Sequence, residues 1–336
     1  MSEIPRGAIR FNTDSNKPEL YDGNQWTELQ ISNVGLGTGG DTGPGARGIF
    51  GGGYSPTLLN TIDYINIAST GDAIDFGDLT TARITHSSAC ASSSRGVWAG
   101  GREVPTPTFN IIDYITIAST GNAQDFGDLS GTYYDYAGLS NSTRGIFGGG
   151  SPPPYNNNIE YITIASTGNA QDFGDLTVAK SISGGCSSPT RGIFAGGNPS
   201  PSAGINSIDF ITIATLGNAQ DFGDLTQARL ALSSSSNPTR GIFFAGTSGG
   251  AINLIDCITI STTGNATNFG DLSYTTAYSF SCASSVRAVA AGGNTPAKVN
   301  NIEYVNITTE SNSVNFGDLT GVRAYGSATS NAHGGL

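Results

Sequence analysis

The tetrapeptide Phe-Gly-Asp-Leu occurs six times in this chain, at intervals of 47 to 50 residues. Two further runs recur in step with it, one of the form Arg-Gly-Ile-Phe-Ala-Gly-Gly and one of the form Ile-Glu-Tyr-Ile-Thr-Ile. A fixed period of this length indicates an array of equivalent structural units. We therefore expect six copies of one unit. The copies of the tetrapeptide begin at Phe76, Phe126, Phe173, Phe222, Phe269 and Phe316.

Each unit is predicted to hold four strands. The Ile-Glu-Tyr-Ile-Thr-Ile run is rich in β-branched and aromatic residues and places apolar side chains on both faces of an extended strand. It is followed by Ser-Thr-Gly-Asn, in which Gly and Asn accept the positive φ of a tight hairpin turn. The Phe-Gly-Asp-Leu strand, a segment of small residues and the Arg-Gly-Ile-Phe strand complete the repeat. Four-stranded units buried on both faces favour an all-β fold, a six-bladed β-propeller.

The end of the chain supplies a strand that the first unit lacks. No small-residue strand precedes Arg47, whereas residues 323–333 align with the segment that begins at Arg83. We expect the C-terminal segment to pair with the strand at 47–53 and close the ring. Cys90, Cys186 and Cys282 each lie five residues before a repeat Arg, so they should surround the central channel as packing residues.

Charge and composition exclude several classes of partner. The chain carries 26 acidic residues against 15 Lys and Arg, for a net charge of −11, and has no basic run, so we expect no nucleic-acid binding. No apolar stretch is long enough for membrane insertion, and the first residues lack the apolar segment of a signal peptide. Four Cys without C-x-x-C spacing and two distant His, His86 and His333, predict no metal site, no cofactor and no copper centre.

Residues 47–336 resemble the kelch repeat. The resemblance is carried by the Gly pair at 196–197, by Glu160-Tyr161, by Phe173 before Leu176, and by Arg83, Arg229 and Arg323. Phe stands where kelch repeats usually have Trp, so the similarity is to the galactose-oxidase-like kelch propellers. This resemblance implies a propeller and carries no information on function.

The first 31 residues belong to no repeat. Residues 7–29 predict three short strands separated by polar turns at 13–17 and 22–24. So small a sheet needs a partner for its stability, and the Gly-rich segment 32–46 is typical of a linker. We therefore divide the chain into an N-terminal β-hairpin module (1–31), a linker (32–46) and a propeller (47–336).

The N-terminal module resembles the short hairpin modules of tailed-phage virion proteins, especially those of fibres and other appendages. The residues that carry the resemblance run from Ile9-Arg10-Phe11-Asn12-Thr13-Asp14 to Tyr21-Asp22-Gly23 and Trp26. It implies attachment to other virion proteins, with Phe11, Tyr21 and Trp26 as anchoring residues, and a virion location after assembly in the host cytoplasm. No heptad pattern sets a stoichiometry, so a homo-oligomer stays open.

The segments after each Gly pair differ from unit to unit, whereas the Ser-Thr-Gly-Asn turns barely change. Variable loops on a repeated scaffold usually carry recognition. Aromatic and amide side chains there suit a glycan, although each one is equally well explained as part of a tolerant connector. The candidate binding residues are Tyr54, Arg102, Phe109, Tyr155, Asn156, Asn198 and Lys298.

Two charged patterns recur with the repeat, and we expect them to pair within each blade as structural residues. A calcium site is disfavoured, because the Asp spacing matches no loop motif that supplies five or more oxygen ligands. The first pattern comprises Arg47, Arg95, Arg144, Arg191, Arg240 and Arg287, and the second comprises Asp75, Asp125, Asp172 and Asp221.

These features favour a non-enzymatic structural protein of a bacteriophage virion: a tail fibre, a neck or tail appendage, or a capsid decoration. Its module would attach it, and its propeller would display a surface for host or glycan recognition. A cellular kelch-type adhesion or adaptor module is the alternative. A polysaccharide-degrading enzyme is a third, since paired carboxylates for glycoside hydrolysis are not recognisable from sequence alone.

Overall fold

The structure, a computed structural model of the chain, describes residues 5, 7–12, 17–21, 23–28, 46–104, 106–181, 183–199 and 203–336. These residues form strands and turns, and among them there is no helix that could cross a membrane. The chain divides into two units, Met1–Thr38 and Gly39–Leu336.

The second unit is built from six four-stranded antiparallel sheets, the blades, in each of which the strands are named from the innermost outward. Blade 1 consists of β31 (Ser327–Ser330), β4 (Arg47–Gly51), β7 (Thr61–Asn66) and β8 (Ile74–Asp78). Blade 2 consists of β9 (Ala89–Ala91), β10 (Arg95–Arg102), β11 (Thr108–Thr116) and β12 (Gln124–Asp128). Blade 3 consists of β13 (Ala137–Ser140), β14 (Arg144–Gly148), β15 (Asn158–Thr163) and β16 (Gln171–Asp175). Blade 4 consists of β17 (Gly184–Ser187), β18 (Arg191–Ala195), β19 (Ile205–Thr212) and β20 (Gln220–Arg229). Blade 5 consists of β21 (Ser233–Ser236), β22 (Arg240–Phe244), β23 (Ile252–Thr259) and β24 (Thr267–Thr276). Blade 6 consists of β25 (Phe280–Ala283), β26 (Arg287–Ala291), β29 (Asn301–Asn306) and β30 (Val314–Asp318).

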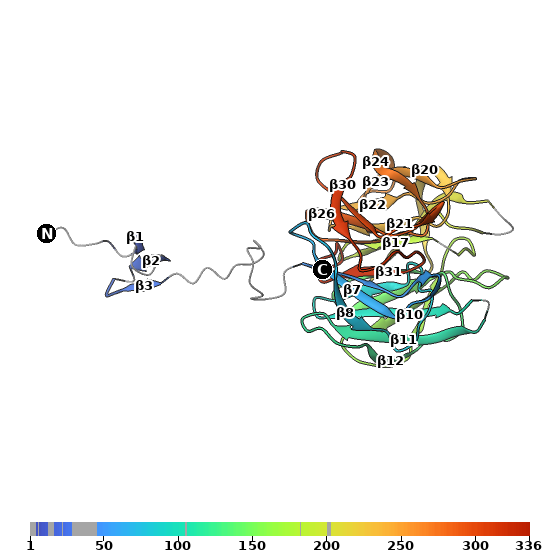
Figure 1. Cartoon of the computed structure of the whole chain (residues 1–336), viewed down its shortest axis with the longest axis horizontal. Coiled ribbons are helices and arrows are strands. Elements are labelled where there is room, and N and C mark those ends of the chain that lie inside the picture. The colour runs from blue at the N-terminus through green and yellow to red at the C-terminus, as the bar shows by residue number, and fades with distance from the viewer. Residues whose placement is uncertain are drawn as a thin grey trace. The chain divides into compact units, whose positions relative to one another are not determined.

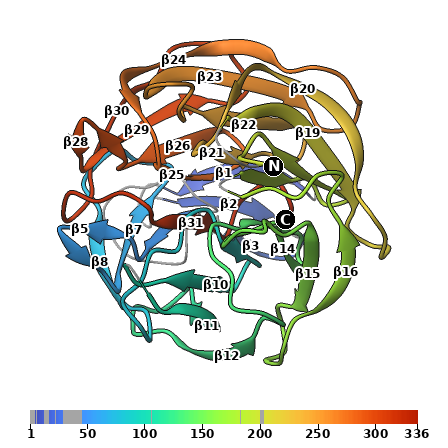
Figure 2. The same cartoon turned by 90° about the vertical axis from the view of Figure 1, so that its right-hand side faces the viewer.

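The blades are arranged around a central axis (Figure 2), which confirms the expected six-bladed β-propeller. Short hairpins extend two of the loops, β5 (Tyr54–Ser55) with β6 (Thr57–Leu58) and β27 (Asn294–Thr295) with β28 (Ala297–Lys298). The ring closes as predicted, because β31 pairs with β4 in the register Thr329↔Ile49. In Figure 1 the red β31 lies beside the blue β7 of the same sheet. The first blade is therefore made from both ends of this unit.

The core lies between blades. Six clusters of buried apolar residues fill the six interfaces between neighbouring blades. At the interface of blades 1 and 2, for example, Ile49 and Phe76 pack with Trp98 and Ile115. Each central strand presents one face to the preceding blade and one to the following blade, which explains why its apolar residues do not alternate with polar ones.

The repeated Ser-Thr-Gly-Asn turn joins each blade to the one before it. The N–H of Gly121 donates to the carbonyl of Phe76, and the Asn122 side chain accepts a hydrogen bond from the N–H of Asp78. Gly77 has a φ of +147°, and a Cβ there would lie 2.5 Å from the carbonyl oxygen of Gly121. Corresponding bonds link the other neighbouring blades, so the near-identity of these turns reflects a structural requirement.

Serine hydroxyls connect the innermost strands. The Ser140 hydroxyl donates to the carbonyl of Ala91 and accepts from its N–H, and Ser187 donates to the carbonyl of Ser140 in the same way. Ser236 and Ser330 repeat the contact at two more interfaces. Serine thus links neighbouring blades near the axis at four of the six interfaces, whereas Ala91 and Ala283 occupy the equivalent positions in the other two blades.

The repeated arginines do not pair with the repeated aspartates, so that prediction was wrong. Arg95 instead donates to the carbonyl of Ile164 in the next blade, and its guanidinium lies 4.6 Å from the ring of Tyr114. Arg95 stands opposite Thr116 and Asp125 opposite Asp113, three residues away, which separates them by about 10 Å along the strand. Asp75, Asp125, Asp172 and Asp221 are exposed, and Arg47, Arg144, Arg191, Arg240 and Arg287 make the same carbonyl contact as Arg95.

The buried ion pairs lie elsewhere: each of the four joins the end of an outer strand, or the linker after it, to the following blade. Arg83 Nη1 lies 2.8 Å from Asp113 Oδ2, and both side chains are buried. Where the acid is Glu160 or Glu303, the basic position is Tyr133 or Thr276, and the ion pair is absent. The Glu side chain still accepts from the N–H of Ser130 or Ser273, as Asp113 does from the N–H of Thr80. The other three pairs are Lys180–Asp209, Arg229–Asp256 and Arg323–Asp63.

The first unit contains one three-stranded antiparallel sheet, in the order β1 (Ile9–Asn12), β2 (Lys17–Tyr21), β3 (Trp26–Glu28), as predicted. Tyr21 and Trp26 stand opposite each other with ring centroids 5.3 Å apart, and the Arg10 guanidinium lies 4.3 Å from the Trp26 ring. Phe11 lies in β1 opposite Pro18, and its side chain is outside the described residues. Of the linker 32–46, only Ala46 is described.

Candidate functional site

The propeller has two unlike faces. One, the tail face, carries the Ser-Thr-Gly-Asn turns, the chain entry at Ala46 and the final segment Asn331–Leu336. The other, the loop face, carries the variable segments 54–60, 102–110, 151–158, 198–206, 247–254 and 294–300 together with the linkers between blades. Because successive strands in a blade are antiparallel, these two sets of connections lie at opposite ends of the strands.

The predicted binding residues fall into separate groups on the loop face. Lys298 Nζ lies 4.6 Å from the centre of the Tyr54 ring, and the Asn198 amide donates to the Tyr155 hydroxyl at 3.3 Å. Arg102 stacks at 4.5 Å on Tyr134, a residue that the sequence did not single out. All five predicted residues in these contacts are half-buried.

The other two predicted residues, Asn156 and Phe109, are not part of these contacts. The Asn156 side chain accepts from the N–H of Asn158, so it stabilises its own turn. Phe109 is half-buried in β11, opposite Gly101. The sequence predicted one binding surface on the loop face, whereas the structure places these residues in several separate contacts.

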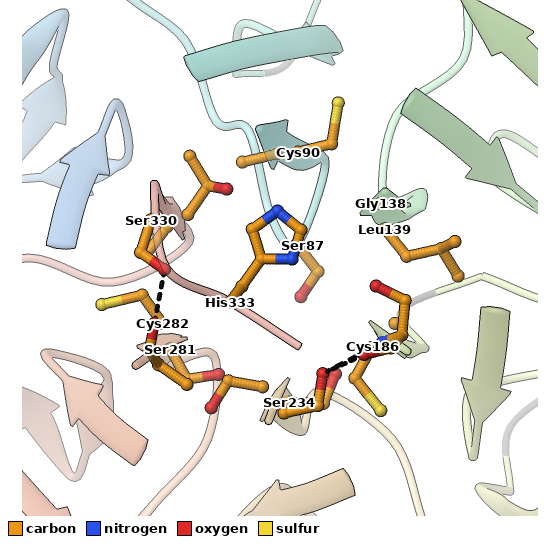
Figure 3. Close-up of a pocket in the computed structure, with 18 of the residues that line it drawn as sticks. Ser87, Cys90, Gly138, Leu139, Cys186, Ser234, Ser281, Cys282, Ser330 and His333 are labelled. Atoms are coloured by element: carbon orange, nitrogen blue, oxygen red, sulfur yellow. Dashed lines mark hydrogen bonds between the residues drawn. The ribbon is translucent and has the colours of Figure 1, made fainter. Parts of the chain in front are cut away.

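The central channel is narrow. Its cavity, of about 50 Å³, is lined by the innermost strands, including Cys90, Cys186 and Cys282 as predicted. Figure 3 shows their sulfur atoms pointing away from the centre, toward neighbouring blades. A Cβ on Gly145, for instance, would lie 2.5 Å from Cys90 Sγ. The volume suits a few water molecules and excludes a larger ligand.

The final segment closes the channel at the tail face. His333 projects into the ring (Figure 3), where its Nε2–H donates to the carbonyl of Ala91 and its Nδ1 accepts from the N–H of Gly335. This pattern requires a neutral imidazole, and burial lowers the pKa of His333 to about 4. Gly334 and Gly335 are buried against the ends of the innermost strands, where a Cβ would collide with the carbonyls of Asn237 and Ser140.

A polar and aromatic cluster lies at the loop-face end of the channel. We call Arg102, His86, Asp135, Tyr278 and Tyr325 the mouth cluster. His86 Nδ1 lies 3.7 Å from Asp135 Oδ1, the His86 and Tyr278 rings are 5.5 Å apart, and the Tyr278 and Tyr325 rings are 4.3 Å apart. The four residues other than Arg102 lie in linkers between blades, and Arg102 ends β10.

The electrostatics of the mouth cluster are set by burial and by Arg102. Burial, and then the Arg102 charge, lower the pKa of His86 to about 4. Burial raises the pKa of Asp135 to about 6, against the opposing effect of Arg102. Near neutral pH the cluster therefore contains one cation, one carboxylate and a neutral imidazole.

Sequence reasoning found only Arg102 of this cluster. One sequence signal was available, because the linker of blade 2 is one residue longer than its counterparts: Arg95 is the sixteenth residue after Leu79, whereas Arg144 is the fifteenth after Leu129. The extra residue falls in the turn that contains His86 and Ser87.

A shallow hollow of about 440 Å³ adjoins the mouth cluster at Tyr278, between the loops of blades 5 and 6. Every side chain that lines it is uncharged. The lining residues are Thr247, Ala251, Thr275, Ala277, Tyr278, Asn294 and Pro296.

The described residues contain no group of three or more His, Cys, Asp or Glu side chains arranged to hold a metal ion. A comparison with models of known protein families found no match, and a comparison with curated proteins found no significant similarity. The geometry of the loop face is thus the basis for a functional proposal, together with the resemblances noted in the sequence.

Proposed function

We propose that this chain is a non-enzymatic structural protein of a tailed-phage virion, whose propeller recognises the host surface through its loop face. The observation that carries the proposal is the contrast between the two faces. Turns of the tail face are nearly constant because each one bonds to the preceding blade, as Asn122 does to Asp78. Each loop-face segment is held to a linker by a backbone bridge at its first residue, as Asn198 is to Ser181, and beyond that residue the segments differ in every blade. This is the pattern of a recognition surface on a rigid scaffold.

Attachment is assigned to the N-terminal module, on its resemblance to phage appendage hairpins. Its three strands form a sheet too small to be stable alone in water, so a partner protein would complete it. The chain enters the propeller beside Asn331, whose side chain accepts from the N–H of Arg47, so the connection reaches the tail face.

The location is tested by labelling phage particles with an antibody to the loop segment 150–158 and imaging them. Discrete labelling of a tail, neck or capsid position supports the proposal. Labelling of uninfected host cells instead would favour a cellular adhesion or adaptor module.

Recognition is tested separately by measuring binding of the full chain to isolated host envelopes. We expect saturable binding that the same loop antibody blocks and that an antibody to the tail-face turn 119–122 does not block. Release of soluble sugar during the incubation would contradict the non-enzymatic part of the proposal.

A further inference from the structure

His86 is a buried histidine whose ring has no hydrogen-bond partner in the part of the chain that the structure describes. It is fully buried, and neither ring nitrogen makes a hydrogen bond to any described residue. Buried polar groups are nearly always bonded, because an unsatisfied one loses the solvation that it had in water. The single extra residue in the blade 2 linker has thus created an unsatisfied polar group beneath the mouth of the channel.

Two neighbours of His86 also keep unused bonding capacity. The Asp135 side chain is only 10% exposed, yet its carboxylate accepts no hydrogen bond from any described residue. The Nε–H of Arg102 is buried and has no acceptor among the described residues, while the rest of the side chain is partly exposed. An open acceptor, an open donor and an amphoteric ring therefore lie together at one position on the axis.

The backbone at this position is strained. Asp135, Tyr278 and Tyr325 occupy equivalent places in three linkers and have positive φ, at 61°, 58° and 64°; Ala231, at the same place in a fourth linker, has φ 59°. Non-glycine residues are disfavoured there by about 1–2 kcal/mol, and this chain uses glycine at many other positive-φ positions. Because Ala231 shares this conformation, the conformation belongs to the repeat, and it holds the Asp135, Tyr278 and Tyr325 side chains at matching places in their linkers.

The tyrosines provide an apolar platform beside these polar groups. Tyr278 and Tyr325 are half-buried, so part of each ring faces the solvent. Tyr278 also lines the uncharged hollow of about 440 Å³, whose wall includes the amide side chain of Asn294. Binding sites commonly combine aromatic surface with a few convergent polar groups, and the mouth cluster with its hollow has this combination.

We propose that the mouth cluster and the adjoining hollow bind a neutral pyranose ring at the end of a host glycan. A sugar has hydroxyl groups that both donate and accept, and a C–H face that packs on an aromatic ring. Asp135 accepts from a hydroxyl, Arg102 donates to a ring or hydroxyl oxygen, and Tyr278 and Tyr325 contact the C–H face. This inference rests on the proposed function and names the ligand class of its recognition surface.

A neutral sugar is favoured over an acidic one by the charges. Arg102 and Asp135 balance each other in the cluster, and the lining of the hollow is uncharged. The chain as a whole carries a net charge of −11, which repels anionic ligands.

The test is titration of the full chain with methyl glycosides of glucose, galactose, mannose and N-acetylglucosamine, and with sialic acid as the acidic probe, followed by ligand-detected NMR. We expect a dissociation constant on the order of 1 mM for at least one neutral glycoside, as suits a ligand of about a dozen heavy atoms. Tyr278→Asn, Tyr325→Asn and Asp135→Asn should each weaken binding about tenfold or more. Asn tolerates positive φ, so these variants should keep the fold, which a melting curve checks.

Asp125→Asn is the matched control for Asp135→Asn, because Asp125 is an exposed carboxylate in β12, outside the mouth cluster. It should bind the glycoside as the unaltered chain does. Loss of binding in Asp125→Asn with retention in Asp135→Asn would overturn the inference and leave the proposed function standing. Binding of sialic acid alone, or of no sugar while envelope binding persists, would also overturn it.

Discussion

Arg323 Nη2 lies 2.9 Å from Asp63 Oδ2, and the two residues are 260 positions apart in the chain. Arg323 belongs to the last linker and Asp63 to the first blade, so this contact exists only in the closed ring. The same contact joins neighbouring blades at three other interfaces. Ring closure therefore uses a bond that the repeat already contains.

Arg323→Met should destabilise the protein by about 3–5 kcal/mol, because it leaves the Asp63 carboxylate buried without its partner. The double variant Arg323→Met with Asp63→Leu should recover most of that loss, since no buried charge remains. Denaturation by urea measures both. Asp125→Asn, at an exposed position, is the control and should change stability by less than about 0.5 kcal/mol. Equal stability of Arg323→Met and the unaltered chain would refute the role of the pair.

Two truncations separate closure of the ring from closure of the channel. Deleting 323–336 removes β31 and leaves the edge of β4 unpaired, so we expect unfolding or aggregation. Deleting only 331–336 keeps β31 and should preserve the fold with a lower melting temperature. Circular dichroism and size-exclusion chromatography distinguish these results. A chain lacking 323–336 that stays monomeric and melts normally would contradict the closure.

A pair of glycine substitutions tests the contact between each outer strand and the next turn. Gly77 and Gly121 have similar φ, +147° and +153°, so alanine is strained by the backbone at both. Only at Gly77 does the new Cβ also meet the neighbouring blade, 2.5 Å from the Gly121 carbonyl oxygen. Gly77→Ala should therefore be less stable than Gly121→Ala by about 1–3 kcal/mol. Equal losses in urea denaturation would show that the contact is unimportant.

The histidine in the channel predicts a dependence of stability on pH. Its pKa is about 4 in the folded protein and about 6.5 in the unfolded chain, so between these values the unfolded chain binds the extra proton. Stability therefore falls as the pH drops from 6.5 to 4, and protonation of Nδ1 removes the acceptor for the N–H of Gly335. For a partly buried group we expect roughly 1–3 kcal/mol of such loss.

His333→Gln isolates this contribution. His86 acts in the same direction, whereas the raised pKa of Asp135 acts in the opposite one, favouring the folded state as the pH drops through about 6. The unaltered chain should lose more stability between pH 6.5 and 4 than His333→Gln does. Identical pH profiles would mean that His333 is as easily protonated in the folded protein as in the unfolded chain.

The fold could be predicted because the repeat makes it redundant. Six copies of Phe-Gly-Asp-Leu, and a last segment matching the one at Arg83, determine both the number of blades and the closure, which β31 and β4 confirm. The three strands of the first unit were also readable from their turns.

The charge pairs were not predictable from the pattern within one repeat. Arg95 and Asp125 recur together in the repeat, but Arg95 donates to a carbonyl of the next blade and Asp125 is exposed to solvent. Sequence spacing does not reveal contacts between blades. The correct pairing was visible only as a covariation: the basic residue is absent at Tyr133 and Thr276, where the following blade has Glu160 and Glu303 in place of Asp.

The mouth cluster was largely missed for a related reason. His86, Asp135, Tyr278 and Tyr325 occupy linkers that look like connectors in sequence, and they meet only because four blades converge on one axis. The prediction concentrated on the longer loops, which lie farther from the axis. The loop-face residues Tyr155 and Asn198, predicted separately, proved to contact each other.

Hydrogen–deuterium exchange of the full chain, with and without host envelope fragments, tests most directly whether the loop face is the recognition surface. The account predicts added protection in the variable segments and in the linkers around residues 84–87, 133–136, 276–279 and 323–326. The tail-face turns, such as 119–122, should show no change. Protection confined to the tail-face turns, or to residues 1–31 alone, would contradict it.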